Sequence, residues 1–319
     1  MNLQKLFSIT ATIALIGCQN NMKNIEETTP KVNAQKFQIS LAQWSIHNQI
    51  LDGSIDPMNF ASLAKDLGYS GIEYVSTLYM GDEVNYAMKE QGLDSILKEL
   101  KIRSDELGMT NVLIMIDDEG DLSVDDPKEA AQAVDNHKKW VDAAAFLKCH
   151  AIRVNLFGTA NPRAWLSNSI RSLKALSTYA AERNVSILVE NHGGLSSNAK
   201  LLTKVMEGVA MENCGTLVDF GNFCIRRKND ARWDEPCVEK YDLYQGIEEL
   251  MPYAKGVSAK SYAFDAQGNE TSMDFPRILN IVRDSGFSGF IGVEFEGPDA
   301  DPREGIAATK RLIEQVLMN

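Results

Sequence analysis

Ionisable side chains stand at the ends of short apolar runs in the second half of the sequence. They are, in chain order, Glu190 with His192, Asp219, Lys260 and Glu294. Burying such groups costs free energy unless they meet a ligand or one another. We therefore expect these side chains to lie together at one site.

Three of these groups are carboxylates, and each follows a different run. If Glu190, Asp219 and Glu294 converge, they repel one another unless a cation lies between them. Their hard oxygen atoms suit Mg²⁺, Mn²⁺ or a similar divalent ion. The residues alone leave a second interpretation open, in which each carboxylate pairs with Arg153 or Lys260 in a buried structural network.

Eight apolar runs of strand length recur along the chain. They are 37–44, 71–75, 111–116, 150–156, 185–190, 215–219, 256–260 and 289–294. Longer segments with apolar residues at helical spacing lie between them, for example 57–67, 128–147 and 163–182. Alternation of this kind predicts a parallel sheet, and eight units in about 280 residues predict a (β/α)8 TIM barrel. A doubly wound open sheet is the alternative, but no G-x-G-x-x-G motif follows any run.

The predicted barrel would gather these polar groups at one end. Catalytic groups in such barrels come from the carboxyl ends of the strands. Side chains alternate with a period of two, so Arg153 shares a face with Asn155, and Ser258 shares a face with Lys260. We expect these faces to point into the barrel while the alternating apolar residues pack on the helices.

Composition narrows the class of ligand. The 319 residues carry a formal net charge of -12, and the sequence pI is near 4.9. This balance argues against nucleic-acid binding, which needs a basic face. Four histidines also argue against a multi-metal nuclease. A small sugar or a divalent cation stays compatible with the charge.

The N-terminus resembles a bacterial lipoprotein signal. Residues 1–17 hold an apolar run too short to span a bilayer, followed by Cys18 in the sequence Leu-Ile-Gly-Cys. This pattern implies cleavage before Cys18 and lipidation of that residue. We expect 18–36 to be a flexible tether and 37–316 to be the barrel domain. Gln19 at the next position favours the periplasmic side of the outer membrane of a Gram-negative bacterium, with lipid as the sole membrane contact.

Four cysteines remain after the lipidation site, and none forms a C-x-x-C pair. Cys224 and Cys237 fall in one predicted loop region and are the pair that an oxidising compartment could join. We expect Cys149 and Cys214, at the starts of two non-neighbouring strands, to be buried free thiols.

Several segments together carry a family resemblance. VENHGG (189–194), VDFGNF (218–223), GVSAKS (256–261) and IGVEFEG (291–297) occur in this order. With ISLAQWSIH (39–47), GIEYV (71–75) and CHAIRVN (149–155), they resemble the sugar phosphate isomerase/epimerase family with the xylose-isomerase-like barrel. The resemblance covers nearly all of 37–316. ENHGG, DFGN and SAKS together are similar to an exported branch in which some members are lyases or hydrolases of 3-keto-glycosides.

The resemblance implies a site for a divalent metal, with Mn, Mg, Co and Zn left open. Carried over, its ligands are Glu190, Asp219 and Glu294. The family commonly has a histidine where this chain has Ser258, and often a histidine where it has Asn222. These two changes weigh against classical keto-sugar epimerisation, which usually needs two opposed acid and base groups.

The implied reaction is proton abstraction next to a ketone, followed by β-elimination of the C1 substituent of a 3-keto-glycoside. His192 is the first candidate for the base and His47 the second, and Lys260 would donate a proton or stabilise the oxyanion. The residues expected to hold the sugar are Arg153, Asn155, Asn222, Ser258, Trp44 and Glu73. Keto-sugar isomerisation or epimerisation is the alternative, as is a non-catalytic sugar-binding lipoprotein. A homo-oligomer is left open.

Overall fold

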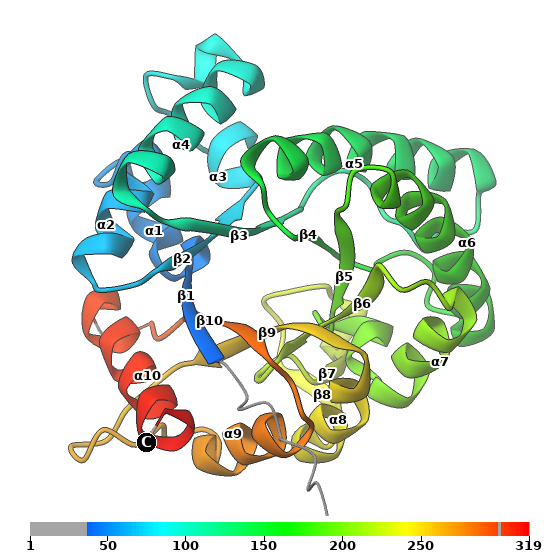
Figure 1. Cartoon of the computed structure of the whole chain (residues 1–319). Coiled ribbons are helices and arrows are strands. Elements are labelled where there is room, and N and C mark those ends of the chain that lie inside the picture. Colours follow the sequence, from blue (N-terminus) through cyan, green and yellow to red (C-terminus); the bar gives the residue numbers. More distant parts are fainter. Residues whose placement is uncertain (1–36, 299–300, 319) are drawn as a thin grey trace, which may run out of the picture. The chain divides into compact units, whose positions relative to one another are not determined.

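The computed structural model describes residues 37–298 and 301–318. The predicted signal peptide, Cys18 and the tether therefore lie outside the described residues. Within the described part, eight parallel strands close into a barrel in the order β1-β10-β9-β6-β5-β4-β3-β2. Figure 1 shows this ring of strands with the helices around it. The predicted (β/α)8 barrel is confirmed.

The barrel strands match the eight apolar runs to within a few residues at each end. They are β1 Phe37–Ala42, β2 Gly71–Val75, β3 Thr110–Met115, β4 Ala151–Val154, β5 Ser186–Glu190, β6 Cys214–Asp219, β9 Ala254–Ser261 and β10 Gly289–Phe295. The first run is shorter than expected, because Gln43–Ile46 forms a 3-10 turn and places Trp44 after the strand.

The helices cover the outside of the barrel and begin with clear local signals. They are α1 His47–Leu51, α2 Phe60–Asp66, α3 Thr77–Met80, α4 Leu93–Leu107, α5 Pro127–Leu147, α6 Pro162–Ala181, α7 Ala199–Val209, α8 Leu243–Leu250, α9 Phe275–Asp284 and α10 Pro302–Leu317. Asp126 and Asn161 each accept a backbone N–H at a helix N-terminus, and a proline follows each of them. Such caps satisfy donors that a helix cannot satisfy internally.

Strand register brings the polar groups to one level of the barrel. Asp219 aligns with Ser258 across β6 and β9. Lys260 aligns with Glu294 across β9 and β10. The apolar residues that alternate with these groups, such as Val218 and Val293, are fully buried. The prediction that polar and apolar side chains take opposite faces of these strands is therefore confirmed.

A small antiparallel hairpin follows β6 and lies outside the barrel sheet. Its strands are β7 Cys224–Arg227 and β8 Cys237–Lys240. Cys224 and Cys237 are joined by a disulfide bond, as expected. Cys149 is a buried free thiol, whereas Cys214 is free but only partly buried, so that part of the prediction is wrong.

The described ranges contain no helix with the length and apolarity needed to cross a membrane.

Candidate active site

Three buried carboxylates meet inside the barrel near the carboxyl ends of its strands. Glu190 ends β5, Asp219 ends β6 and Glu294 lies near the end of β10. Each offers an oxygen atom, and these atoms lie within 4.8 Å of one another. All three residues are at most 5% exposed. The sequence prediction that they converge is thus confirmed in geometry.

Ser258 lies between two of the carboxylates. Its hydroxyl oxygen is 2.9 Å from Asp219 Oδ2 and 2.6 Å from Glu294 Oε2. A hydroxyl has one proton, so it donates to one carboxylate at a time. The other oxygen of Asp219 accepts the backbone N–H groups of Gly221 and Asn222, which hold this carboxylate in place.

Two buried cations flank the cluster. Lys260 Nζ is 3.7 Å from Asp219 Oδ2 and 3.6 Å from Glu294 Oε1. Arg153 Nε is 2.9 Å from Glu190 Oε2. The sequence left two interpretations open, a metal site and a network of buried ion pairs. The structure contains the ion pairs as well as the converging carboxylates.

The cluster has more carboxyl groups than cations. Two cations face five carboxylates, namely Asp117, Glu190, Asp219, Glu294 and Glu296. Burial raises the pKa of Glu190, Asp219 and Glu294, although Arg153 and Lys260 oppose this shift. Burial acts to lower the pKa of Lys260, but the carboxylates of Asp219 and Glu294 raise it well above its ordinary value. A divalent cation would offset this excess, and the three hard oxygen donors fit one.

His192 is fixed by a chain of hydrogen bonds. Asn155 Nδ2 donates to Asp117 Oδ1 over 2.7 Å, so its amide oxygen faces His192. His192 Nδ1 lies 2.8 Å from that oxygen and acts as the donor. This network leaves Nε2 with the lone pair. Burial, together with the charges of Arg153 and Lys260, lowers the pKa of His192 to about 3, so the ring is neutral at pH 7.

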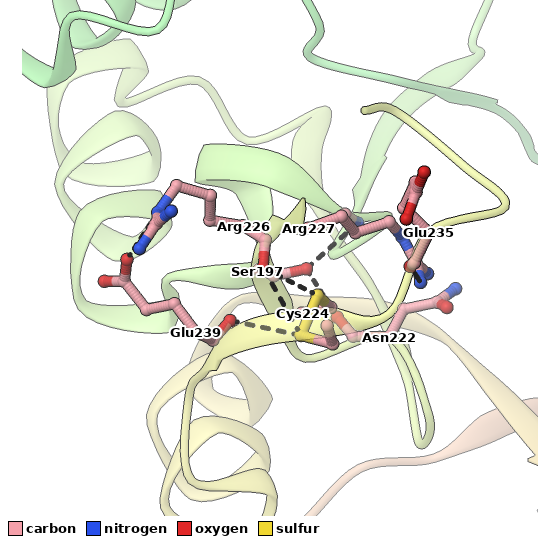
Figure 2. Close-up of a disulfide and its surroundings, with 9 residues drawn as sticks. Ser197, Asn222, Cys224, Arg226, Arg227, Glu235 and Glu239 are labelled. Atoms are coloured by element: carbon pink, nitrogen blue, oxygen red, sulfur yellow. Dashed lines mark hydrogen bonds and ion pairs between the residues drawn. A yellow bond between two sulfur atoms is a disulfide. The ribbon is translucent and has the colours of Figure 1, made fainter. Parts of the chain in front are cut away.

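An aromatic wall stands beside His192 and is carried partly by the disulfide hairpin. The Trp233 ring lies 4.9 Å from the His192 ring and 5.7 Å from the Phe157 ring, between centroids. Arg232 covers Phe157 and pairs with Asp121 at 2.8 Å. Figure 2 shows the disulfide that joins the two strands of this hairpin, with Arg226 and Glu239 near it.

A second aromatic wall lies after β1. The rings of Trp44 and His47 are stacked, with centroids 4.1 Å apart and planes 4° apart. His47 Nδ1 donates to the Trp44 carbonyl over 2.5 Å. The Trp44 indole donates to Glu296, and Lys260 Nζ lies 3.4 Å from the same carboxylate.

The structure groups most of the predicted site residues and separates a few. Arg153, Asn155, Asn222, Ser258, Lys260 and His192 all surround the carboxylates. Trp44 and His47 stand to one side, after β1. Glu73 contacts other groups than the three carboxylates. Its carboxylate accepts a hydrogen bond from Ser40 over 2.5 Å and packs against Gly292. Its contact with a sugar stays a prediction.

Sequence reasoning missed Asp117 and Trp233. Asp117 directly follows the run 111–116, so the strand-end rule that found Asp219 could also have found it. Trp233 lies in a hairpin whose strands lack an apolar alternation, and no local signal places it beside His192.

Solved structures with the same fold include sugar epimerases. The chain resembles 3-keto-D-glucoside 4-epimerase from E. coli, with a TM-score of 0.64 and 13% identity, over 88% of this chain and 100% of that chain. It also resembles L-ribulose 3-epimerase, with a TM-score of 0.66 and 15% identity, over 88% of this chain and 94% of that chain. At these identities the likeness concerns the fold.

A curated relative matches over a short stretch. The C-glycoside deglycosidase alpha subunit of Arthrobacter globiformis is 41% identical over 49 residues, which are 15% of this chain and 14% of that subunit. The family comparison extends much further, because the model for the xylose isomerase-like TIM barrel family matches residues 61–315. With its closed eight-stranded barrel, the chain belongs to the xylose isomerase-like TIM barrel family.

Proposed function

We propose that this protein is a metal-dependent sugar enzyme that removes the proton next to a ketone. The proposed reaction is β-elimination of the C1 substituent from a 3-keto-glycoside. The observation that carries the proposal is the buried cluster of Glu190, Asp219 and Glu294 beside Lys260. Family membership and the short match to a deglycosidase subunit support it.

The three carboxylates would hold the divalent ion. When bound, this ion supplies a Lewis acid for the ketone oxygen and a neighbouring hydroxyl. The choice among Mn, Mg, Co and Zn is left open. Asn222 Nδ2 donates to Glu190 over 3.0 Å and so orients one of the ligands.

His192 is the proposed base. Its Nδ1 proton is committed to Asn155, so Nε2 carries the lone pair that would accept the proton from C2 of the sugar. The low pKa of the ring makes it a weaker base than an ordinary histidine. The electron pair of that C–H bond forms the enolate at C2 and C3. It then forms the C1–C2 double bond while the C1 substituent leaves with its bonding pair and takes up the proton that His192 removed from C2.

Lys260 acts in this proposal as a fixed positive charge. It is 2% exposed and is surrounded by carboxylates, which hold its proton at Nζ. A charge that is already oriented stabilises a developing oxyanion without reorganisation. This geometry favours oxyanion stabilisation over proton donation among the two roles predicted for Lys260.

Isomerisation or epimerisation of a keto-sugar is the second candidate. The same enolate would take its proton back at carbon instead of losing the C1 substituent. The sugar epimerases among the solved structures with this fold favour it. The proposed export to the periplasm favours an unphosphorylated substrate for either reaction.

Product analysis tests the proposal. The full chain in mild detergent is incubated with methyl 3-keto-β-D-glucoside and Mn²⁺ or Mg²⁺, with and without EDTA, and followed by NMR and mass spectrometry. We expect methanol and a 2-hydroxy-3-keto-glycal, and no reaction with EDTA. Glu190→Gln should lose turnover, whereas Glu106→Gln, at an exposed position on α4, should keep it. Deuterium exchange at C2 without methanol release would favour the epimerase, and unchanged activity of Glu190→Gln would refute the metal site.

A further inference from the structure

A cavity of about 400 Å³ opens beside the carboxylate cluster, between the segment after β1 and the segment after β10. Its lining includes Trp44, His47, Asn48, Gln49 and Glu296. This volume lies within the range of roughly 300–1,000 Å³ that is typical of small-molecule sites. Trp44 and His47, which sequence analysis placed next to the sugar, both line this space.

One wall of the cavity is flat and rigid. Trp44 and His47 stack face to face, and each ring is held by a hydrogen bond to its surroundings. A flat aromatic surface favours another ring, because ring-on-ring packing buries apolar area without ordering a flexible side chain. Asn48 and Gln49 bring amide groups to the same cavity, and amides hydrogen-bond hydroxyls.

Glu296 connects the cavity to the reacting groups. Its carboxylate lines the cavity, and Oε2 lies 3.4 Å from Lys260 Nζ. The same Nζ is 3.6 Å from Glu294 Oε1. The cavity is therefore separated from Lys260 and the carboxylate cluster by the Glu296 side chain alone.

The charge of the lining selects against anions. Within the described part of the chain, the lining carries one carboxylate and one imidazole, and it has no Lys or Arg. A phosphate group here would be repelled by Glu296 and would find no cation to pair with, because Lys260 already pairs with three carboxylates. The lining therefore disfavours an anionic group, and the amides of Asn48 and Gln49 suit an uncharged one.

We propose that this cavity is a leaving-group subsite, which holds an uncharged, hydroxylated ring attached at C1 of the reacting sugar. The inference rests on the proposed function, and it narrows the substrate class to glycosides with a ring-sized C1 substituent. A second sugar and a phenol share this chemistry. A sugar ring uses the amides of Asn48 and Gln49 more fully than a phenol does.

The test compares three 3-keto-β-D-glucosides whose C1 substituents are methyl, phenyl and glucosyl. The kcat/KM of each is measured with the full chain and Mn²⁺, and isothermal titration gives the Kd of each. We expect the two ring-bearing compounds to be preferred over the methyl compound. Trp44→Ala should reduce this preference by about tenfold, as expected for the loss of a stacked ring. Trp44→Phe should keep most of it, and Phe146→Ala, an exposed aromatic change on α5, should not alter it.

The outcomes separate the subsite from the reaction. Loss of preference for the glucosyl compound alone in Gln49→Ala identifies a second sugar, because the phenyl ring has no hydroxyl for this amide. No effect of Gln49→Ala on either ring-bearing compound identifies an aryl group. Equal wild-type values for all three compounds overturn the subsite. An equal loss on the methyl compound in Trp44→Ala also overturns it, because the wall would then contact the reacting ring. If the compounds bind in the expected order but give no products, the subsite stands and the proposed reaction fails.

Discussion

Glu73 offers a sharp test of the electrostatics inside the barrel. It is 1% exposed, Ser40 donates to its Oε1 over 2.5 Å, and its Oε2 is buried without a partner. Burial raises the pKa of Glu73 from 4.5 to about 7. The folded protein therefore keeps this carboxyl protonated at pH values where the unfolded chain ionises it.

The sign of the effect on stability follows from this difference. Below pH 4.5 the carboxyl of Glu73 is protonated in both states and contributes no difference. Between pH 4.5 and 7 the folded state loses stability as pH rises, because ionisation favours the unfolded chain. Above pH 7 the loss is constant. A difference of about 2.5 units at ~1.4 kcal/mol per unit amounts to about 3 kcal/mol.

Glu73→Gln should remove this loss. The amide has nearly the same shape, carries no charge and can still accept from Ser40. We expect the variant to match the wild type near pH 4.5 and to exceed it by up to about 3 kcal/mol at pH 8. At roughly 2–4 °C per kcal/mol, the gain in Tm at pH 8 is about 6–12 °C.

Thermal and urea unfolding at half-unit steps from pH 4.5 to 8.5 provide the measurement. Glu106→Gln serves as the control, because its side chain is exposed on α4 and should change stability little at any pH. A difference between Glu73→Gln and the wild type that does not grow with pH would refute the reasoning. So would a variant that is less stable than the wild type at pH 8.

Three further predictions follow from the described contacts. Gly292→Ala should destabilise the barrel by about 1–3 kcal/mol in urea unfolding, because a Cβ there would lie 2.6 Å from both oxygens of Glu73; an unchanged midpoint would contradict this packing. The double variant Cys224→Ser, Cys237→Ser should lower the free energy of unfolding by up to about 3 kcal/mol, and by less if the hairpin opens independently of the barrel. A reductant should not lower the stability of this variant further. Mn²⁺ at about 100 times its Kd should stabilise the wild type by about 2.7 kcal/mol in thermal unfolding and leave Glu190→Gln unchanged; equal shifts would place the ion elsewhere.

The barrel could be predicted from sequence because its strands have a strong local pattern. In the run 289–294, apolar residues alternate with glycine and glutamate, and the period of two indicates which face each residue takes. The same alternation placed Glu294 inside the barrel. The parallel order of the strands then determined that Glu190 and Asp219 would meet it, as the structure shows.

The remaining parts of the site depend on contacts that no local pattern encodes. Strands β7 and β8 carry charged residues such as Arg226 and Glu239 without an apolar face, so period-two reasoning found no strand there. The position of Trp233 depends on where that hairpin folds back. The role of Ser258 as a bridge between Asp219 and Glu294 follows from side-chain distances of 2.9 and 2.6 Å, which sequence spacing cannot supply.

The pairing of β1 with β10 has a consequence for how the chain folds. Phe37 pairs with Gly289 and Leu41 pairs with Val293, so the barrel closes only after almost the whole chain has been synthesised. Contacts this distant in sequence slow folding, and until they form both strands expose unpaired edges. Trp44 follows β1 and Glu296 follows β10, so the cavity between them exists only once this seam is closed. A ring bound there would hold the seam shut, and hydrogen exchange of the β1 amides should slow as the cavity fills.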